Sequence, residues 1–350
     1  MQHIDLWSAT KTAVEKYLTA LISERTTSAQ HIHRQYQNLW QDIGHVIKGG
    51  KGFRPYLVVI GYGKLDDAIV PIAAAQEMVH AAVLMHDDII DQDTVRRNML
   101  NVNGRYLERY QPYLPHHEAL HYAYSAGLLA GDALLSEAYL AIAQSSMHAD
   151  IKMAVAGRLH HSIFEVLGGE LLDVEASFIS DITYDPMTSS RYKTSGYSFV
   201  GPLHVGAICR GAPEQDFKLL EDFGINAGIG FQLQDDLLGV FGLQTDTGKS
   251  NLNDLREAKD TYLIKCYTGR LKPGSPEQQA FDATFGNLSA TDAELAALKE
   301  NIEASGARAE TEQKIGFYYD QAVAALAGLT HPEQANELTR LVELLRERKG

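Results

Sequence analysis

Apolar positions recur at helical spacing along nearly the whole chain. The segment 128–142 is typical, because Leu, Ala, Tyr and Ile side chains return every three or four residues. No stretch shows the sustained alternation of apolar and polar residues that marks a half-buried strand. Glycine and proline interrupt the pattern near 49–55, 61–63, 112–115, 184–187, 211–213 and 269–275. The pattern therefore predicts an all-α protein with helices of roughly 15 to 25 residues.

The arrangement of these helices is predicted from the chain length and the positions of the glycine and proline breaks. The chain has 350 residues, contains no long linker and shows no repeat of fixed period. We expect a single domain over residues 1–350, built as one large helical bundle around a central cavity where ligands bind. The polar stretch 285–310 is expected to be a surface helix or a partly independent hairpin.

Charge and cysteine usage limit the partners and the compartment. The net charge of −14 argues against nucleic acid as the main partner, although 31 lysines and arginines could still converge on a small anion. Cys209 and Cys266 lie far apart and match no metal or redox spacing, which favours a reducing cytoplasm. The N-terminus has no signal-peptide pattern, and charged, His or Gly residues break the most apolar segments. No membrane span is predicted.

The first chemical signal is Asp87-Asp88-Ile89-Ile90-Asp91, which follows the apolar run 79–85. On a helix the three carboxylates fall within an arc of roughly 100°. Like charges this close repel one another, and charge at the end of an apolar helix must be paired. Mg²⁺ takes oxygen ligands and commonly bridges carboxylates to substrate phosphates, so the motif predicts a magnesium site. The plain alternative is a solvated acidic helix face.

A second carboxylate pair, Asp235-Asp236, occupies the mainly apolar segment 230–239. Gln232 lies three residues before Asp235 and shares its helix face. Two such helices facing each other would form a cavity with an acidic mouth and an apolar body.

These two segments resemble the first and second aspartate-rich motifs of the trans-isoprenyl diphosphate synthases, or polyprenyl synthetase family, and the similarity extends over residues 40–265. The resemblance implies an isoprenoid synthase-type fold, a homodimer, and magnesium-dependent condensation of isopentenyl diphosphate with dimethylallyl, geranyl or farnesyl diphosphate. It also implies three magnesium ions. Asp87 and Asp91 would hold two of them and Asp235 the third, with Asp88 and Asp236 in support.

The resemblance also assigns a set of diphosphate-binding residues. Each of them alone could be a surface cation, a turn or a core histidine, but together they form an ordered set that chance would rarely supply. The isopentenyl diphosphate contacts would be Lys51, Arg54, His80 and Arg97. The allylic diphosphate contacts would be Arg96, Lys193, Thr194, Gln232, Lys249 and Lys259.

The chemistry explains the need for such a set. Breaking the allylic carbon–oxygen bond leaves a carbocation and a diphosphate anion, and the developing negative charge requires metal ions and preorganised cations. The carbocation requires a dry apolar pocket, because water would trap it. No protein nucleophile is expected, and the final proton would leave with the released diphosphate.

Several positions depart from the family pattern. Gly239 stands where the second motif usually has a third aspartate. Gly52 replaces an arginine, Glu170 a glutamine, and Asn98 a glycine. If Asp235 carries most of the metal coordination at the second motif, activity should survive the first of these changes.

Product length should depend on how far the growing chain can run down the helix below Asp87. The proposed wall is formed by Val79, Ala82 and Val83, none of which is bulky. This favours a product of C20 or longer, with geranylgeranyl diphosphate preferred over farnesyl or longer polyprenyl diphosphates. Plugs from other helices, such as Phe164 or Tyr124, stay open as alternatives.

Three other functions compete with this interpretation. A noncatalytic subunit of a heteromeric prenyl transferase would be favoured by loss of an aspartate motif, but both motifs are present. A terpene cyclase or diphosphate lyase shares the ionisation step but has no use for a second diphosphate site. An acidic structural bundle would leave buried carboxylates without neutralising partners.

Overall fold

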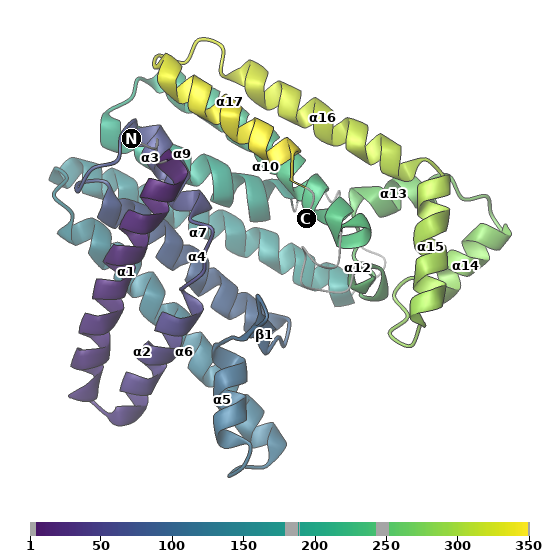
Figure 1. Ribbon diagram of the computed structural model, residues 1–350, viewed down its shortest axis with the longest axis horizontal. Coiled ribbons are helices and arrows are strands. Elements are labelled where there is room, and N and C mark those ends of the chain that lie inside the picture. The colour runs from purple at the N-terminus through teal and green to yellow at the C-terminus, as the bar shows by residue number, and fades with distance from the viewer. Residues whose placement is uncertain (1–4, 179–187, 189, 243–251, 349–350) are drawn as a thin grey trace. The chain divides into compact units, whose positions relative to one another are not determined.

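The computed structural model describes residues 5–178, 188, 190–242 and 252–348, and their regular structure is almost entirely helical (Figure 1). The predicted all-α fold is confirmed. Contacts divide the chain into two compact units. Unit 1 comprises Met1–Ile163 and Gly201–Pro213, and unit 2 comprises Phe164–Val200 and Glu214–Gly350. The expectation that residues 1–350 act as one domain stays a prediction.

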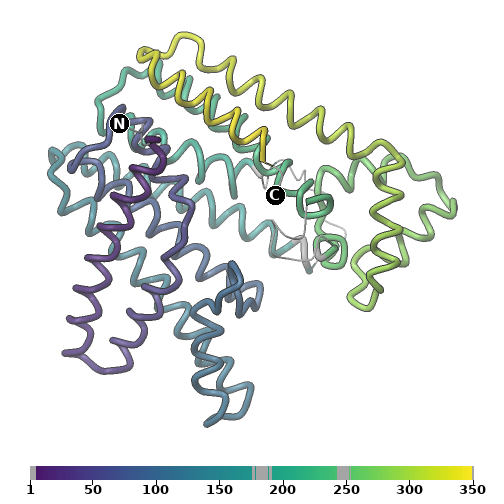
Figure 2. Tube along the Cα trace, in the orientation of Figure 1, coloured from purple at the N-terminus to yellow at the C-terminus, as the bar shows by residue number. Residues whose placement is uncertain are grey.

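Unit 1 contains the N-terminal helices, a short hairpin and one helix from later in the chain. Its elements are α1 (Leu6–Gln30), α2 (Arg34–Val46), α3 (Phe53–Tyr62), α4 (Val70–Ile90), β1 (Val95–Arg96), β2 (Met99–Leu100), α5 (Val102–Tyr110), α6 (His116–Gln144), the first part of α7 (Ala149–Phe178), and α9 (Gly201–Arg210). In the chain trace, α1 and α2 form an antiparallel pair (Figure 2).

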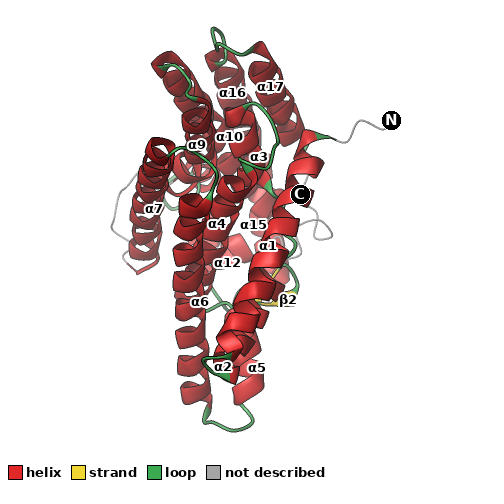
Figure 3. Cartoon of the chain, turned by 90° about the vertical axis from the view of Figure 1, so that its left-hand side faces the viewer, coloured by secondary structure: helices red, strands yellow, loops and turns green. Residues whose placement is uncertain are grey.

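Helix α4 is the buried centre of unit 1, and it lies against α6 (Figure 3). Small residues make this approach close. A side chain at Gly131 would overlap the ring of His86, and one at Gly127 would lie 3.2 Å from Ile89. Overlap of this kind in a packed interior forces backbone shifts. These two glycines therefore fix α4 against α6, and α4 is the helix that carries the first aspartate motif.

Helix α6 is the one helix among the described residues that is long and apolar enough to cross a membrane, with a hydropathy of 1.4. Its packing accounts for much of that apolar character, because α4 and α5 both lie against it. Ala123, Ala130 and Leu134 are fully buried in this contact. A core helix of this kind passes the same length and composition test.

The chain leaves α4 through a two-stranded hairpin. Val95 pairs with Leu100 and Arg96 with Met99. The turn residues Arg97 and Asn98 have φ values of 53° and 58°. A two-residue turn with both central residues at positive φ matches the twist of the strands, and Asn tolerates this conformation better than most residues. Asn98 can therefore replace the glycine of the family pattern while the turn keeps its shape.

Unit 2 is organised around α10, and its C-terminal helices surround that helix. Its elements are the second part of α7, η1 (Ser190–Val200), α10 (Glu214–Phe241), α12 (Asn253–Arg256), α13 (Tyr262–Thr268), α14 (Pro276–Thr284), α15 (Asp292–Ala304), α16 (Ala307–Ala325) and α17 (Pro332–Arg346). Helices α16 and η1 both pack on α10, and α16 and α17 run antiparallel (Figure 1). The stretch 285–310 contains α15, followed by the start of α16.

Glycines allow η1, which is a π-helix, to lie close to its neighbours. A side chain at Gly228 of α10 would overlap Ser195, and one at Gly169 of α7 would lie 2.7 Å from the backbone nitrogen of Lys193. π-Helical turns are rare and are often found at functional sites. Here the π-helix carries two predicted diphosphate contacts, Lys193 and Thr194.

Candidate active site

The first aspartate motif lies at the C-terminal end of α4, where Arg96 bridges two of its carboxylates. The Arg96 guanidinium donates from Nε to Asp88 Oδ1 at 2.6 Å and from Nη2 to Asp87 Oδ2 at 2.8 Å. Charge-assisted bonds of this length are among the stronger protein hydrogen bonds. The β1–β2 hairpin thus returns its arginine to the helix that precedes it, where this cation pairs with Asp87 and Asp88.

The three carboxylates of this motif have different environments. Asp88 is 2% exposed, and burial raises its pKa to about 6 despite the opposing effect of Arg96. Asp87 is partly buried, whereas Asp91 is exposed at the C-cap of α4. Asp87 and Asp91 are therefore the more accessible carboxylates for a metal ion, and Asp88 lies behind them.

Two asparagines fix the loop beneath the motif. Asn101 and Asn103 donate from Nδ2 to the backbone oxygen of Asp93 at 2.9 and 3.3 Å. Asn101 also caps α5, because its Oδ1 accepts from the backbone nitrogen of Gly104 at 2.8 Å. The backbone nitrogen of Asp93 in turn donates to the carbonyl of Asp88. The segment between α4 and β1 is thereby tied to both helices, which places Arg96.

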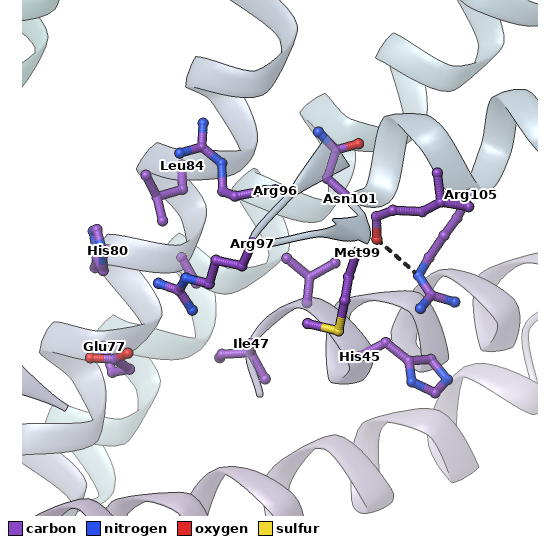
Figure 4. A pocket seen from close by; sticks show the side chains of 13 residues that line it. His45, Ile47, Glu77, His80, Leu84, Arg96, Arg97, Met99, Asn101 and Arg105 are labelled. Carbon is purple, nitrogen blue, oxygen red and sulfur yellow. Dashed lines mark hydrogen bonds between the residues drawn. The ribbon is translucent and has the colours of Figure 1, made fainter. Parts of the chain in front are cut away.

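A pocket in unit 1 lies beside the hairpin and is rich in cationic side chains. Figure 4 shows the Arg97 guanidinium directed toward His80 and Glu77. Ile47 and Leu84 add apolar wall. The rest of the lining comprises His45, Val46, Ala81, Arg96, Met99, Leu100, Asn101 and Arg105. Such a lining suits a small anion with an apolar tail.

Glu77 is the carboxylate of this pocket and was not predicted from the sequence. Burial raises its pKa, while the charges of Arg54 and Arg97 oppose that shift. A side chain at Gly50 would overlap the Glu77 carboxylate, so the glycine loop before α3 approaches it closely. Glu77 therefore lies against the Gly50 loop and within the electrostatic influence of Arg54 and Arg97. The only sequence signal was a charge inside an apolar helix, one turn before His80.

His80 is neutral in this environment. Burial is the main cause that lowers its pKa well below 6.5, and the charges of Arg54, Arg97 and Arg96 lower it further. Three of the four predicted isopentenyl diphosphate contacts, Arg54, His80 and Arg97, therefore share one electrostatic environment. Lys51 lies in the loop just before α3, where its backbone oxygen accepts a hydrogen bond from Trp7 Nε1 at 2.7 Å.

The second aspartate motif is part of a continuous polar chain within unit 2. Thr194 Oγ1 donates to Gln232 Oε1 at 2.7 Å, and Gln232 Nε2 donates to Asp236 Oδ1 at 3.0 Å. Lys259 Nζ lies 3.1 Å from the same Asp236 oxygen. Burial raises the pKa of Asp236, which Lys259 and Gln232 oppose. Four predicted residues, from η1, α10 and the loop after α12, thus meet in one network.

Lys193 of η1 is held by two carboxylates of α7. Its Nζ lies 2.7 Å from Asp173 Oδ2 and 2.9 Å from Glu170 Oε2. Burial opposes the charged form, but Asp173 and Glu170 outweigh it and raise the pKa of Lys193. Glu170, which departs from the family glutamine, therefore has a local partner.

Asp235 is paired with the last described residue of the chain. Arg348 Nη2 donates to Asp235 Oδ1 at 2.8 Å, and its guanidinium lies over the ring of Phe231. Gln234 Nε2 donates to the Arg348 carbonyl at 2.9 Å, and Gln234 Oε1 accepts from the buried Tyr319 hydroxyl at 2.7 Å. The C-terminal segment is thus anchored on the helix that carries the second motif.

These ion pairs test whether the predicted magnesium ligands fit the ion. No group of three or more His, Cys, Asp or Glu residues within the described ranges is arranged to hold a metal ion. Instead a cation stands beside Asp87 and Asp88, another beside Asp235, and a third beside Asp236. The motif residues themselves all offer carboxylate oxygens, which are the ligand type that Mg²⁺ prefers. The chemistry of these carboxylates therefore fits magnesium, provided that Arg96, Lys259 and Arg348 pair with another anion when the ion is bound.

The remaining predicted residues are accounted for as follows. Lys249 lies outside the described residues. Val79 and Ala82 of α4 are fully buried, whereas Val83 is partly exposed. Arg348 was not predicted from the sequence, because its contact with Asp235 joins residues 113 positions apart.

Comparisons with known proteins identify the family to which the chain is similar. A model of the polyprenyl synthetase family matches residues 36–302. The chain is 31% identical over 289 residues to geranylfarnesyl diphosphate synthase of Aeropyrum pernix, covering 79% of this chain and 83% of that protein. It is 29% identical over 252 residues to geranylgeranyl diphosphate synthase of Sulfolobus acidocaldarius, covering 71% of each.

A solved structure is similar over almost the whole chain. It is geranylgeranyl pyrophosphate synthase from Corynebacterium glutamicum, complexed with isoprenyl diphosphate and magnesium. The TM-score is 0.89 at 28% identity, and the alignment covers 99% of this chain and 100% of that one.

The neutral state of His80 leads to a prediction about pH. Because the folded-state pKa lies below that of the unfolded chain, the unfolded chain binds the proton first as pH falls. Wild-type protein should therefore lose unfolding free energy below about pH 6.5, at up to about 1.4 kcal/mol per pH unit from this group. His80→Gln should remove that part of the slope in urea denaturation between pH 7.5 and 5.5.

The control is His117→Gln on the exposed start of α6, which should keep the wild-type slope. Identical slopes for His80→Gln and wild type would contradict the assignment of a neutral, buried His80.

Proposed function

Because the chain belongs to the polyprenyl synthetase family, we propose that it is a prenyl transferase that joins isopentenyl diphosphate to an allylic diphosphate and makes geranylgeranyl diphosphate. The observation that carries the proposal is the pairing of Asp87, Asp88, Asp235 and Asp236 with cations of the chain. Such pairs supply carboxylates for metal ions and cations for diphosphates at the same place.

The residues of unit 1 provide for the acceptor substrate. Arg54, Arg97 and the neutral His80 would bind the diphosphate of isopentenyl diphosphate, with Lys51 at the loop. A neutral imidazole donates one hydrogen bond without adding positive charge to an already cationic pocket. The carboxylate of Glu77 would offset part of the positive charge of the two arginines. The apolar side chains of Ile47 and Leu84 help to keep water away from the substrate.

The residues of unit 2 provide for the donor substrate. Lys193, Thr194 and Gln232 would bind the allylic diphosphate, together with Arg96 of unit 1, Lys249 and Lys259. These groups stabilise the negative charge that develops as the allylic carbon–oxygen bond breaks. That residues 1–350 form one domain stays part of this proposal.

Magnesium, when bound, supplies the positive charge that neutralises the departing diphosphate. Asp87 and Asp91 would hold two ions and Asp235 a third, with Asp88 and Asp236 beside them. Isoprenyl diphosphate and magnesium in the Corynebacterium glutamicum complex support this assignment. The positions of Lys259 and Arg348 on the second motif mark which cations must change partner.

Product length rests on the face of α4 below the first motif. Val83 lies one turn before Asp87 and is partly exposed, whereas Ala82 and Val79 are fully buried. None of them blocks the path with an aromatic ring. Relatives named for geranylgeranyl and geranylfarnesyl diphosphate support a product of C20 or longer.

We also propose a cytoplasmic homodimer. The outer face of α6 exposes Leu128 and Leu129 at 52% and 58%, which is unusual for two adjacent leucines on a long helix. A second copy of the chain would cover them.

The activity predicts a specific outcome in vitro. Purified protein with Mg²⁺, farnesyl diphosphate and isopentenyl diphosphate should release inorganic diphosphate, and omission of either substrate should stop release. Asp87→Ala should reduce turnover at least a hundredfold while the circular dichroism spectrum stays helical, because it removes a metal ligand without a core contact. Absence of turnover in wild type would favour the noncatalytic subunit. Release without isopentenyl diphosphate would favour the lyase.

The product prediction is tested by Val83→Phe. A ring at this partly exposed position should shorten the path and move the main product from geranylgeranyl to farnesyl diphosphate, measured by chromatography of the dephosphorylated alcohols. Val83→Ala, which adds no bulk, should keep the wild-type product or lengthen it. A wild-type reaction that stops entirely at farnesyl diphosphate would overturn the product assignment.

The homodimer predicts a mass change. Leu128→Glu with Leu129→Glu should convert a two-chain particle into a one-chain particle in light scattering, because charge cannot be buried without a partner. Met153→Glu, which also replaces an exposed apolar residue but on α7, should leave the mass unchanged. A wild-type mass of one chain would contradict the homodimer.

A further inference from the structure

Gly239 of α10 stands at the position where the second motif lacks its third aspartate. It follows Asp235 by four residues and Asp236 by three, so it shares their helix face. A carboxylate at this position would extend the acidic face by one turn. Its absence leaves the second motif with fewer negative charges than the first.

Another aspartate fills the space that a side chain at Gly239 would occupy. A Cβ built on Gly239 would overlap Asp254 Oδ2, and Asp254 Cγ would lie only 2.8 Å from it. Asp254 belongs to α12, which packs on α10. The carboxylate is therefore present beside position 239, although a different element carries it.

Asp254 is also joined to the ion network of the second motif. Lys259 Nζ lies 3.7 Å from Asp254 Oδ2 and 3.1 Å from Asp236 Oδ1. The backbone nitrogen of Lys259 donates to the Asp254 carbonyl at 3.1 Å. The two aspartates thus share one lysine, and that lysine is one of the predicted allylic diphosphate contacts.

Close packing alone would explain why residue 239 is a glycine, but it would not explain why the residue packed against it is an aspartate. An aspartate against a helix that already carries two aspartates is electrostatically unfavourable, unless cations compensate. Alanine or serine at 254 would fill a similar space without that repulsion. The carboxylate placed here matches the charge that position 239 lacks.

We propose that Asp254 supplies, from α12, the carboxylate that the second motif lacks at Gly239. It acts as a positioning residue, because Mg²⁺ keeps several bound waters that neighbouring carboxylates can orient. This inference rests on the proposed function. Its consequence is that the usual aspartate cannot simply be restored at 239, because two carboxylates would then compete for one space.

The test moves the carboxylate between the two positions. Asp254→Asn, which keeps the shape, should raise the Mg²⁺ concentration for half-maximal turnover about tenfold, in the range seen when outer-shell partners of metal ligands are removed. Gly239→Asp alone should also impair the enzyme. Gly239→Asp combined with Asp254→Gly should recover most of the wild-type Mg²⁺ response. Gly239→Ala adds bulk without charge and serves as the packing control.

A second readout does not need turnover. Mg²⁺ with inorganic diphosphate should raise the melting temperature of wild type and of the combined variant, and raise it less for Asp254→Asn. The inference is overturned if Asp254→Asn responds to Mg²⁺ like wild type, or if the combined variant is no better than the single ones. A wild type without turnover and without this thermal response would instead contradict the proposed function.

Discussion

Ion pairs between the motif aspartates and cations of the same chain are the interaction on which this site depends. Asp88 is almost fully buried at the end of an apolar helix, and such a charge is tolerated only with a close partner. Arg96 provides that partner and binds Asp87 as well. The hairpin, its turn at positive φ and the asparagines under Asp93 all serve to bring Arg96 back to α4.

The same requirement shapes unit 2 by different means. Asp236 is neutralised by Lys259, and Asp235 by Arg348. Neither cation lies on α10, so α12 and its following loop, together with the C-terminal segment, must be placed before the motif is stable. Glycines at 224, 228 and 169 let η1 approach α10 and α7 closely enough for Thr194 and Lys193 to join their partners. The ion pairs and hydrogen bonds of unit 2 therefore depend on the close backbone packing that these glycines allow.

The helical fold and the motif residues could be predicted from the sequence because both depend on local patterns. Periodic apolar positions predict helices, and Asp87 to Asp91 or Gln232 to Asp236 are recognisable within a few residues. The partners of those residues are less visible. Arg348 pairs with Asp235 across 113 positions, and Asp254 reaches Gly239 only through the packing of α12 on α10. Glu77 was visible as a charge in an apolar run, but the cations that act on it, Arg54 and Arg97, come from the start of α3 and from the hairpin.

The pairing also explains how the motif aspartates would exchange their cations for magnesium without leaving a buried charge unpaired. Removing one partner of a buried pair costs about 3–5 kcal/mol, because the other charge is left uncompensated. A diphosphate that arrives with magnesium would supply both a new cation for the carboxylates and a new anion for the arginines and lysine. In the proposed enzyme, magnesium would be held by the motif carboxylates, and Arg96, Lys259 and Arg348 would pair with phosphate oxygens, for which arginine is well suited. Each of these three cations would then have an anionic partner before and after the substrate binds, so that substrate binding and metal binding would be coupled.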